Sequence, residues 1–518
     1  MRTVDVAATP LATLVAALDE VSARRLEAGA ARARGLLADR RVWNVSATEV
    51  GGVGELLRSL LPYVTGAGVD VRWLVVDGDS DFRLVTDRLH HALHGDRGDG
   101  GPLGRDEMAM YDRVLAANLE EVRSQVAPGD VVVLHDPGTA GLAPGLAARG
   151  AHVVWRCHIG SDVAGEVSDA GWAFLEPSLA HAERSVFSRA DYRPGFLDAV
   201  TVRVIAPSVD PLSAKNRPLE DAEVRDLLRG AGILAGAGST GLGGPGSGVQ
   251  AGGPGSGAQA GSSGSVVRAG GPGSGAQADG PGSVVRTGGL GSVVRAGALG
   301  SVVRTGDLGS VVRAGGPVPP DARVVLQLSR WNRLKDMTGL LIAFDEACEE
   351  LPEDVHLLLA GADVGPEDTE GEEVLERCLQ MWAGLEAGVR ARVHVACLPD
   401  TAASAVVVNA VQRYATVVVQ KSLAEGFGLT VAEALWKGKP VVATAVGGIQ
   451  DQITDGENGL LVDDPRDLAE LMTHVGRLLA EPALARQLGE TAHARVRQAY
   501  LSDRHLLQYV DLIAEMLG

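Results

Sequence analysis

The sequence predicts an α/β protein in which two doubly wound, Rossmann-like parallel sheets face a central cleft. Short apolar runs typical of strands alternate with helical patterns, once before and once after a long Gly-rich segment. Strands separated by helices favour parallel sheets covered on both faces, with ligands bound at the carboxyl ends of the strands. The expected strands are residues 41–45, 71–76, 131–134, 152–156 and 202–206 in the first half, and 324–328, 355–360, 393–396, 416–420 and 440–443 in the second.

The overall composition argues against several kinds of partner. The chain has 518 residues and 45% of them are hydrophobic, which is enough for two or three domains. A formal net charge of −19 argues against nucleic acid or an anionic membrane surface as the main partner. No apolar stretch of about 18 residues is present, and residues 1–20 lack the pattern of a secretory signal. We therefore expect no membrane association and a cytoplasmic location.

The cysteines also bear on the class of protein. Cys157, Cys348, Cys378 and Cys397 lie far apart and form no CxxC pair. This spacing favours reduced, buried thiols over a zinc site or a disulfide framework.

Four segments are expected along the chain. Residues 1–217 form the first Rossmann-like domain and residues 319–495 the second, and residues 218–318 between them hold a linker helix and a repeat insert. Residues 496–518 have helical spacing. They predict a helix that either returns to the first domain or packs on its own domain.

The insert, from about residue 236 to 316, consists almost entirely of Gly, Ser, Pro, Ala, Val and Arg. Its GSVVR unit recurs every nine residues in the last four copies. A Val-Val pair in each unit is too little apolar surface to offset the entropy of ordering the glycines. The insert is therefore expected to be disordered, with an Arg-spaced binding tail as the alternative. Deleting it should be nearly neutral, because loop-closure entropy grows only slowly with length.

The segment from Glu425 to Glu433, EGFGLTVAE, is the most informative about chemistry. Its two glycines allow a close approach of the backbone to a ligand, and the helix that follows presents unpaired N–H groups suited to a phosphate. The two carboxylates can accept hydrogen bonds from sugar and ribose hydroxyls, although capping or solvation could explain either one alone. The candidate binding residues are Glu425, Gly426, Phe427, Gly428, Leu429 and Glu433.

Two cations follow the expected strand at 324–328. Arg330 and Lys335 stand at a strand end, where an open α/β sheet presents ligand-binding residues. A guanidinium fork and an ammonium together suit a diphosphate, so we interpret the pair as a diphosphate site in an otherwise acidic chain.

The first half offers weaker candidates at three strand ends. Glu49, Gly51 and Gly52 lie in a Gly-containing loop between a strand and a helix, which could admit a sugar or a phosphate but lacks the GxGxxG order of a dehydrogenase. Asp136 and His158 follow two consecutive strands and are candidates for the rim of the cleft.

Residues 77–81, DGDSD, resemble a metal-binding acidic motif. They lie in the first half, away from the diphosphate candidates. A solvated acidic turn is therefore the preferred interpretation.

Together these residues resemble glycosyltransferase family 4, the retaining enzymes of the GT-B fold. The pair Glu425 and Glu433 looks like that family's E-x7-E motif, and Arg330 with Lys335 matches its diphosphate-binding pair. Residues 42–55, 155–159, 208–216 and 329–336 are similar to the trehalose-forming branch.

The resemblance implies an acceptor domain at 1–217, a donor domain at 319–495, and synthesis of α,α-trehalose from a nucleoside diphosphate glucose and glucose, with the direction left open. It implies that Glu425 binds donor-sugar hydroxyls, Glu433 the ribose, and His158 the donor sugar near its anomeric carbon. Asp136 would contact donor or acceptor hydroxyls.

Arg330 and Lys335 would stabilise the leaving diphosphate in place of a metal, so no cofactor is expected. Small-molecule substrates are the expected partners, and a homodimer is left open. The remaining alternatives are a trehalose phosphorylase, a transferase for another acceptor, and a non-catalytic sugar-nucleotide sensor.

Overall fold

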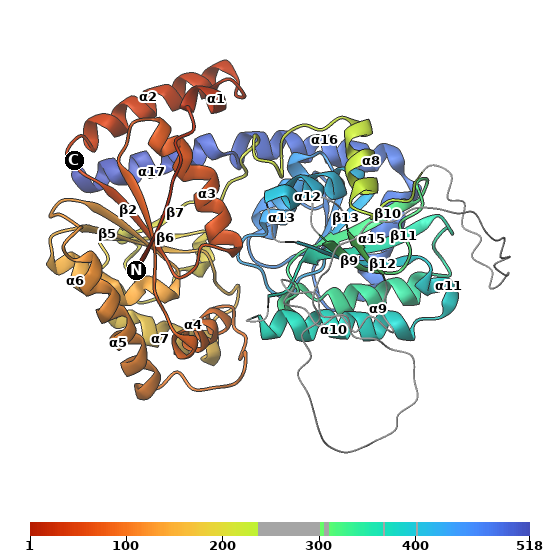
Figure 1. Cartoon of the computed structure of the whole chain (residues 1–518), viewed down its shortest axis with the longest axis horizontal. Helices are drawn as coiled ribbons and strands as arrows, with labels where there is room; N and C mark the ends of the chain where they lie inside the picture. The colour runs from red at the N-terminus through yellow and green to blue at the C-terminus, as the bar shows by residue number, and fades with distance from the viewer. Residues whose placement is uncertain (237–300, 305–309, 366–367, 400–401) are drawn as a thin grey trace, which may run out of the picture.

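The computed structural model describes residues 1–236, 301–304, 310–365, 368–399 and 402–518. It contains two lobes, each built on one sheet, and the two lobes lie side by side (Figure 1). The predicted fold class is confirmed: the core of both sheets is parallel and helices cover both faces.

The first sheet has the strand order β1-β3-β2-β4-β5-β6-β7, and only β1 is antiparallel to its neighbour. The two short strands β1 and β6 were not predicted from the apolar pattern. The strands are β1 Arg2–Val4, β2 Val42–Ser46, β3 Val71–Val75, β4 Val131–His135, β5 His152–Cys157, β6 Arg184–Phe187 and β7 Val202–Val204.

Alternate residues of this sheet face two different helical layers. On β4, Val131 and Val133 face α2, α3 and the C-terminal helix α17 (Ser502–Leu517), whereas Val132 and Leu134 face α4, α5 and α7. Burial on both faces explains why these strands read as continuous apolar runs. The helices of the lobe are α1 Leu11–Val15, α2 Glu20–Leu36, α3 Gly51–Gly66, α4 Ser80–Leu93, α5 Arg105–Val122, α6 Ala143–Ala148 and α7 Glu166–Leu179.

The second sheet has the order β15-β14-β13-β10-β11-β12-β9-β8. Its parallel part comprises β10 Arg323–Leu328, β11 Val355–Ala362, β12 Val393–Leu398, β13 Val417–Gln420, β14 Val441–Thr444 and β15 Leu460–Val462. Its helices are α8 Asp221–Gly230, α9 Met337–Ala347, α10 Thr369–Gly384, α11 Ala387–Arg390, α12 Ala402–Tyr414, α13 Leu429–Trp436, α14 Ile449–Gln452, α15 Leu468–Ala480 and α16 Pro482–Ala499.

The end of the repeat insert adds two strands to this sheet. The last two GSVVR copies form β8 Ser301–Arg304 and β9 Ser310–Ala314, and β9 pairs antiparallel with β12. This differs from the expectation that the whole insert is disordered. A Val-Val pair cannot build a core, but an existing sheet edge offers unpaired backbone groups that a short strand can satisfy. The earlier copies, within 237–300, lie outside the described residues.

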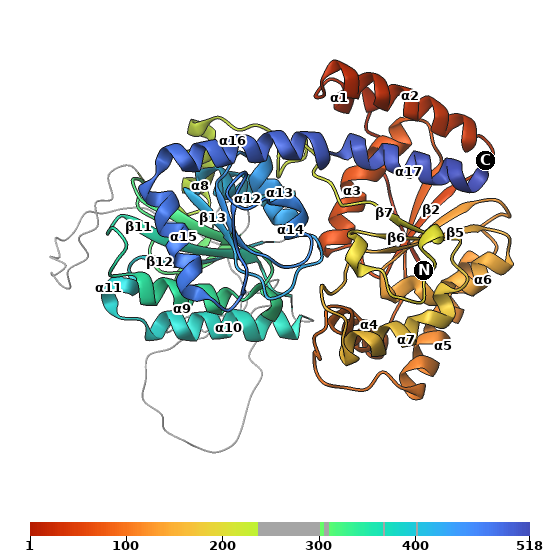
Figure 2. The ribbon, with the colours of Figure 1, turned by 180° about the vertical axis from the view of Figure 1, so that it is seen from behind.

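Two consecutive helices connect the lobes. Helix α16 packs on the second lobe, and α17 Ser502–Leu517 continues onto the first, where it lies against α2 (Figures 1 and 2). The packing is close, because a β-carbon added to Gly29 of α2 would lie 2.3 Å from a methyl carbon of Leu507. Among the described residues, no helix is both long and apolar enough to cross a bilayer.

Candidate active site

The glycine turn of the second lobe meets a strand end of the first. Residues 425–428 end the connection from β13 to α13, and His158 follows β5. A β-carbon added to Gly426 would lie 2.5 Å from the carbonyl oxygen of His158. The structure therefore brings these two predicted site residues together across the boundary between the lobes.

Lys335 and Glu425 form an ion pair at this boundary. The Lys335 Nζ lies 2.5 Å from Glu425 Oε2, and the two side chains are 14% and 11% exposed. Lys335 ends a 3-10 turn, Arg333–Lys335, that Asn332 caps by accepting a hydrogen bond from the Leu334 backbone N–H. The turn thus sets the position of the ammonium before any ligand binds.

Arg330 precedes that turn and is exposed. It makes no ion pair or hydrogen bond within the described residues, so its guanidinium is available to a ligand. Burial holds the pKa of His90 well below its ordinary value, and the positive charges of Arg330 and Lys335 lower it further. The two cations therefore lie near the same histidine of the opposite lobe.

The glycine turn requires Gly at its last position. Gly428 has φ 85° and caps α13, a left-handed conformation that residues with a β-carbon rarely adopt. No side chain caps the helix N-terminus, so its first N–H groups are open to an anion. Phe427 is buried against Tyr500, with ring centroids 5.6 Å apart, and Leu429 begins the helix.

Asp136 and His158 are linked through the backbone. Asp136 Oδ1 accepts a 2.7 Å hydrogen bond from the His158 N–H. Burial raises the pKa of Asp136 to about 7, and its backbone has φ 61°, an uncommon conformation for a residue other than Gly. Part of the role of Asp136 is therefore to hold the segment that carries His158.

His158 also bonds to His135, which the strand-end analysis did not single out. The distance from His135 Nδ1 to His158 Nε2 is 3.1 Å, and His135 Nε2 lies 3.1 Å from Asn44 Oδ1. Burial lowers the pKa of His135 to about 3 and that of His158 well below its ordinary value. Both rings are therefore neutral at physiological pH.

Comparisons with known proteins bear on the family of the chain. Residues 44–194 match the family described as "Trehalose synthase, N-terminal domain", and residues 312–495 match "Glycosyl transferases group 1". The chain is 28% identical over 492 residues to a trehalose synthase of Thermococcus litoralis, covering 94% of this chain and 93% of that protein. A trehalose synthase of Rubrobacter xylanophilus is also 28% identical, covering 93% and 92% of the two chains.

A solved structure shows the same fold. An α,α-trehalose 6-phosphate synthase from Burkholderia multivorans superposes with a TM-score of 0.59 at 14% identity, over 92% of this chain and 97% of that one. The chain is a GT-B glycosyltransferase close to the trehalose synthases. An Anabaena protein solved in complex with UDP and glucose has the same fold, with a TM-score of 0.54 at 13% identity, over 92% of this chain and 100% of that one.

In this glycosyltransferase Glu433 lies inside a polar cluster. It is only 6% exposed, and burial raises the pKa of its carboxyl while Lys215 and Lys437 act in the opposite direction. The Lys437 ammonium donates to Asn216 Oδ1 at 2.8 Å, and Lys215 pairs with Glu55 of α3 at 2.5 Å. Residues 208–216, which resemble the trehalose-forming branch, thus reach the helix that carries Glu433.

The predicted loop with Glu49, Gly51 and Gly52 is only partly a loop, because Gly51 and Gly52 are the first two residues of α3. The Glu49 carboxylate pairs with Arg2 at 2.8 Å and with Arg58 at 2.9 Å, and these partners lower its pKa. Gly51, with φ 76°, and Gly52 are exposed, with open space where a β-carbon would stand. The glycines leave room for a ligand, whereas the Glu49 side chain is tied to its own lobe.

Three histidines near the end of α4 were missed by the sequence analysis. His91 Nε2 lies 3.7 Å from Glu370 of α10, and His94 Nδ1 lies 3.0 Å from the Gly160 carbonyl oxygen. Burial, with Lys335 as the next contribution, lowers the pKa of His94 to about 4. The sequence pattern that could have identified them is the group of three histidines within residues 90–94, at the end of a helix that follows a strand.

The acidic motif at 77–81 has a structural role. Asp79 caps α4 by accepting a 2.9 Å hydrogen bond from the Phe82 N–H. Among the described residues, no three His, Cys, Asp or Glu side chains cluster in a way that could hold a metal ion. Independence from metals remains a prediction.

Proposed function

We propose that this glycosyltransferase joins glucose from a nucleoside diphosphate glucose to free glucose and so makes α,α-trehalose, with retention at the anomeric carbon. The observation that carries the proposal is the Lys335–Glu425 ion pair beside Gly426, in contact with the His158 segment of the opposite lobe. The likeness to trehalose synthases over 94% of the chain supports the choice of product.

The second lobe would hold the donor. The diphosphate would lie between Arg330, Lys335 and the open N-terminus of α13, where two cations and a helix dipole offset its charge. Glu425 would accept hydrogen bonds from the donor sugar and Glu433 from the ribose. Because Lys335 already contacts Glu425, its ammonium would contact both the diphosphate and the carboxylate that binds the sugar.

The first lobe would complete the sugar site. His158 would contact the donor sugar near its anomeric carbon, and Asp136 would contact hydroxyls of the donor or acceptor. The exposed first turn of α3, with Gly51 and Gly52, would admit the acceptor or a phosphate close to the backbone.

In the reaction, the bond from the anomeric carbon to the diphosphate oxygen breaks, and a bond to the acceptor oxygen forms on the same face. The leaving phosphate oxygen would take the acceptor's proton. The protein would supply fixed positive charge where negative charge develops. Because Arg330 and Lys335 provide that charge, we expect no metal requirement.

The test is to supply the purified enzyme with glucose and the glucose donors of UDP, ADP, GDP and TDP, and to identify the product by NMR. Formation of α,α-trehalose in the presence of EDTA is the expected result, and Glu425→Gln should bind the nucleotide but lose turnover.

The reverse reaction distinguishes the alternatives. Trehalose with a nucleoside diphosphate should release a nucleotide sugar. Glucose 1-phosphate formed only with inorganic phosphate would replace the proposal with a phosphorylase. Nucleotide-sugar binding with no turnover on any acceptor would indicate a sensor.

A further inference from the structure

Three polar side chains stand in a row on neighbouring strands of the first sheet. Asn44 is on β2, His135 ends β4 and His158 follows β5, and these strands are adjacent in the order β2-β4-β5. The two contacts between them are both 3.1 Å long. The two imidazole rings are nearly parallel, at 17°, with centroids 5.4 Å apart.

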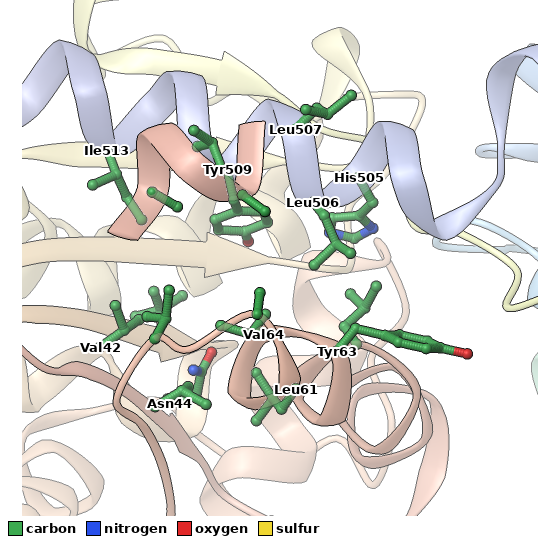
Figure 3. Close-up of a pocket in the computed structure, with 18 of the residues that line it drawn as sticks. Val42, Asn44, Leu61, Tyr63, Val64, His505, Leu506, Leu507, Tyr509 and Ile513 are labelled. Carbon is green, nitrogen blue, oxygen red and sulfur yellow. The ribbon is translucent and has the colours of Figure 1, made fainter. Parts of the chain in front are cut away.

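The row lines one end of an otherwise largely apolar cavity of about 120 Å³. Figure 3 shows Asn44 near Leu61 and Val64 of α3, with Tyr509 and His505 of α17 on the opposite side. His505 has its own partner, since its Nδ1 lies 3.0 Å from Ser208 Oγ. The apolar walls offer Asn44 and His135 few competing hydrogen-bond partners.

The contacts determine where the ring hydrogens lie. Asn44 Oδ1 can only accept, so His135 Nε2 must carry a hydrogen. Burial keeps His135 neutral, which leaves a lone pair on its Nδ1. The hydrogen between the two rings therefore belongs to His158 Nε2.

A neutral imidazole has one N–H, so His158 Nδ1 bears a lone pair. Within the described residues, no donor bonds to that atom. The backbone N–H of the same residue is held by Asp136 Oδ1 at 2.7 Å, which limits rotation of the segment. His158 is thus prepared to accept one hydrogen bond from a ligand.

We propose that Asn44 and His135 are positioning residues that keep the hydrogen of His158 on Nε2, so that Nδ1 accepts a hydrogen bond from a hydroxyl of the donor sugar. The assignment of the sugar as ligand rests on the proposed function. The tautomer itself rests only on the contacts within the row, in which Asn44 and His135 are buried and His158 is half-buried.

The tautomer can be measured in the full-length protein labelled with ¹⁵N-histidine. Ring-nitrogen signals of His158 are assigned by their loss in His158→Gln, at about pH 8. The wild type should show hydrogen on Nε2 of His158. Asn44→Asp, which keeps an acceptor in the same place, should show the same tautomer.

Asn44→Leu removes the acceptor, so His135 is no longer held in one tautomer and a second His158 form should appear. The matched control is Leu57→Ala, which loses packing in the same cavity and no hydrogen bond, and should keep the wild-type signals. Hydrogen on Nδ1 of His158 in the wild type would overturn the proposal, because it means that the Asn44 amide donates. Unchanged His158 signals in Asn44→Leu would overturn it too.

Kinetics provide the second readout. Asn44→Leu should lower kcat/KM for the donor about tenfold, the equivalent of one hydrogen bond, while Asn44→Asp and Leu57→Ala stay within about twofold. An equal loss in Asn44→Leu and Leu57→Ala would count against a positioning role. If the wild type shows the predicted tautomer but makes no trehalose, the proposed function fails and the positioning of His158 stands.

Discussion

The hydroxyl of Tyr192, in the first lobe, lies 2.7 Å from the carbonyl oxygen of Glu425 and 2.9 Å from that of Gly426 in the second. Beside it, Asp162 of the first lobe accepts a 2.6 Å hydrogen bond from the Gly447 N–H. The first lobe therefore holds the backbone of the turn that carries a site carboxylate. Contact between the lobes and the geometry of the site are coupled.

Gly426→Ala should weaken this coupling. The added β-carbon would lie 2.5 Å from the His158 carbonyl oxygen, so the lobes would have to separate. We expect turnover to fall about tenfold or more and the radius of gyration from small-angle scattering to rise. Gly476→Ala is the control, since open space surrounds that glycine in α15. Wild-type turnover in Gly426→Ala would show that this close approach is not needed.

Lys335→Met should lower kcat by about 10² to 10³, as expected when one preorganised charge facing a leaving group is removed. Arg333→Gln is the matched control, because Arg333 is in the same turn but its side chain is 57% exposed and pairs with Glu370. Initial rates and thermal midpoints of both variants distinguish loss of the Lys335 charge from disruption of the turn. A comparable loss in both would mean that the turn, and not the Lys335 charge, is responsible.

Ionisation of His91 should make stability depend on pH. The Glu370 carboxylate raises the pKa of His91 above its ordinary 6.5, with Asp96 adding to the effect and burial and Arg333 opposing it. The pKa of His91 is therefore higher in the folded protein than in the unfolded chain. Protonated His91 stabilises the fold fully below about pH 6.5, and this contribution is lost as the pH rises through the folded pKa. His91→Gln should therefore lower the thermal midpoint more at pH 6 than at pH 9, by about 1 °C.

His181→Gln, at an exposed site, supplies the comparison for that experiment. Equal effects of His91→Gln at both pH values would exclude the ion pair.

Asp136→Asn tests a carboxyl group whose ionisation destabilises the folded protein. Burial raises the pKa of Asp136 from 3.8 to about 7, so ionisation is disfavoured in the folded protein and stability falls as the pH rises from about 4 to above 7. Asn cannot ionise, retains the acceptor for the His158 N–H and tolerates a positive φ. Chemical denaturation should give the free energy of unfolding of the variant and of wild type at pH 5 and at pH 8. The difference, variant minus wild type, should be larger at pH 8 by on the order of 2 kcal/mol. If the variant differs from wild type by the same free energy of unfolding at both pH values, Asp136 is already ionised at pH 5.

Two deletions address the repeat insert. Replacing residues 237–300 with a short Gly-Ser linker should leave turnover and solubility unchanged, because loop length changes the closure entropy only slowly. Replacing residues 237–313 also removes β8 and most of β9, which exposes the edge of β12. This second variant should aggregate, because it leaves a sheet edge unpaired, and this replaces the nearly neutral deletion expected from the sequence. Loss of turnover in the shorter deletion would reveal a role for the repeats.

Much of the fold could be predicted because periodicity and burial act locally. The apolar runs at 131–134 and 324–328 are strands β4 and β10, since a strand covered on both faces must be apolar throughout. The short strand β6 and the pairing of β9 with β12 could not be predicted in this way. Four or five residues carry little pattern, and a strand added to a sheet edge depends on a partner distant in sequence.

The sequence by itself determined which residue types stand at the strand ends: the glycine turn after β13, the two cations after β10 and the histidine after β5. Only the tertiary structure decided what they meet. It placed Lys335 against Glu425, Gly426 against His158, and Asn44 and His135 in a row with His158. Local propensity acts along the chain, whereas these contacts depend on how two sheets pack and on which side chains the packing removes from water.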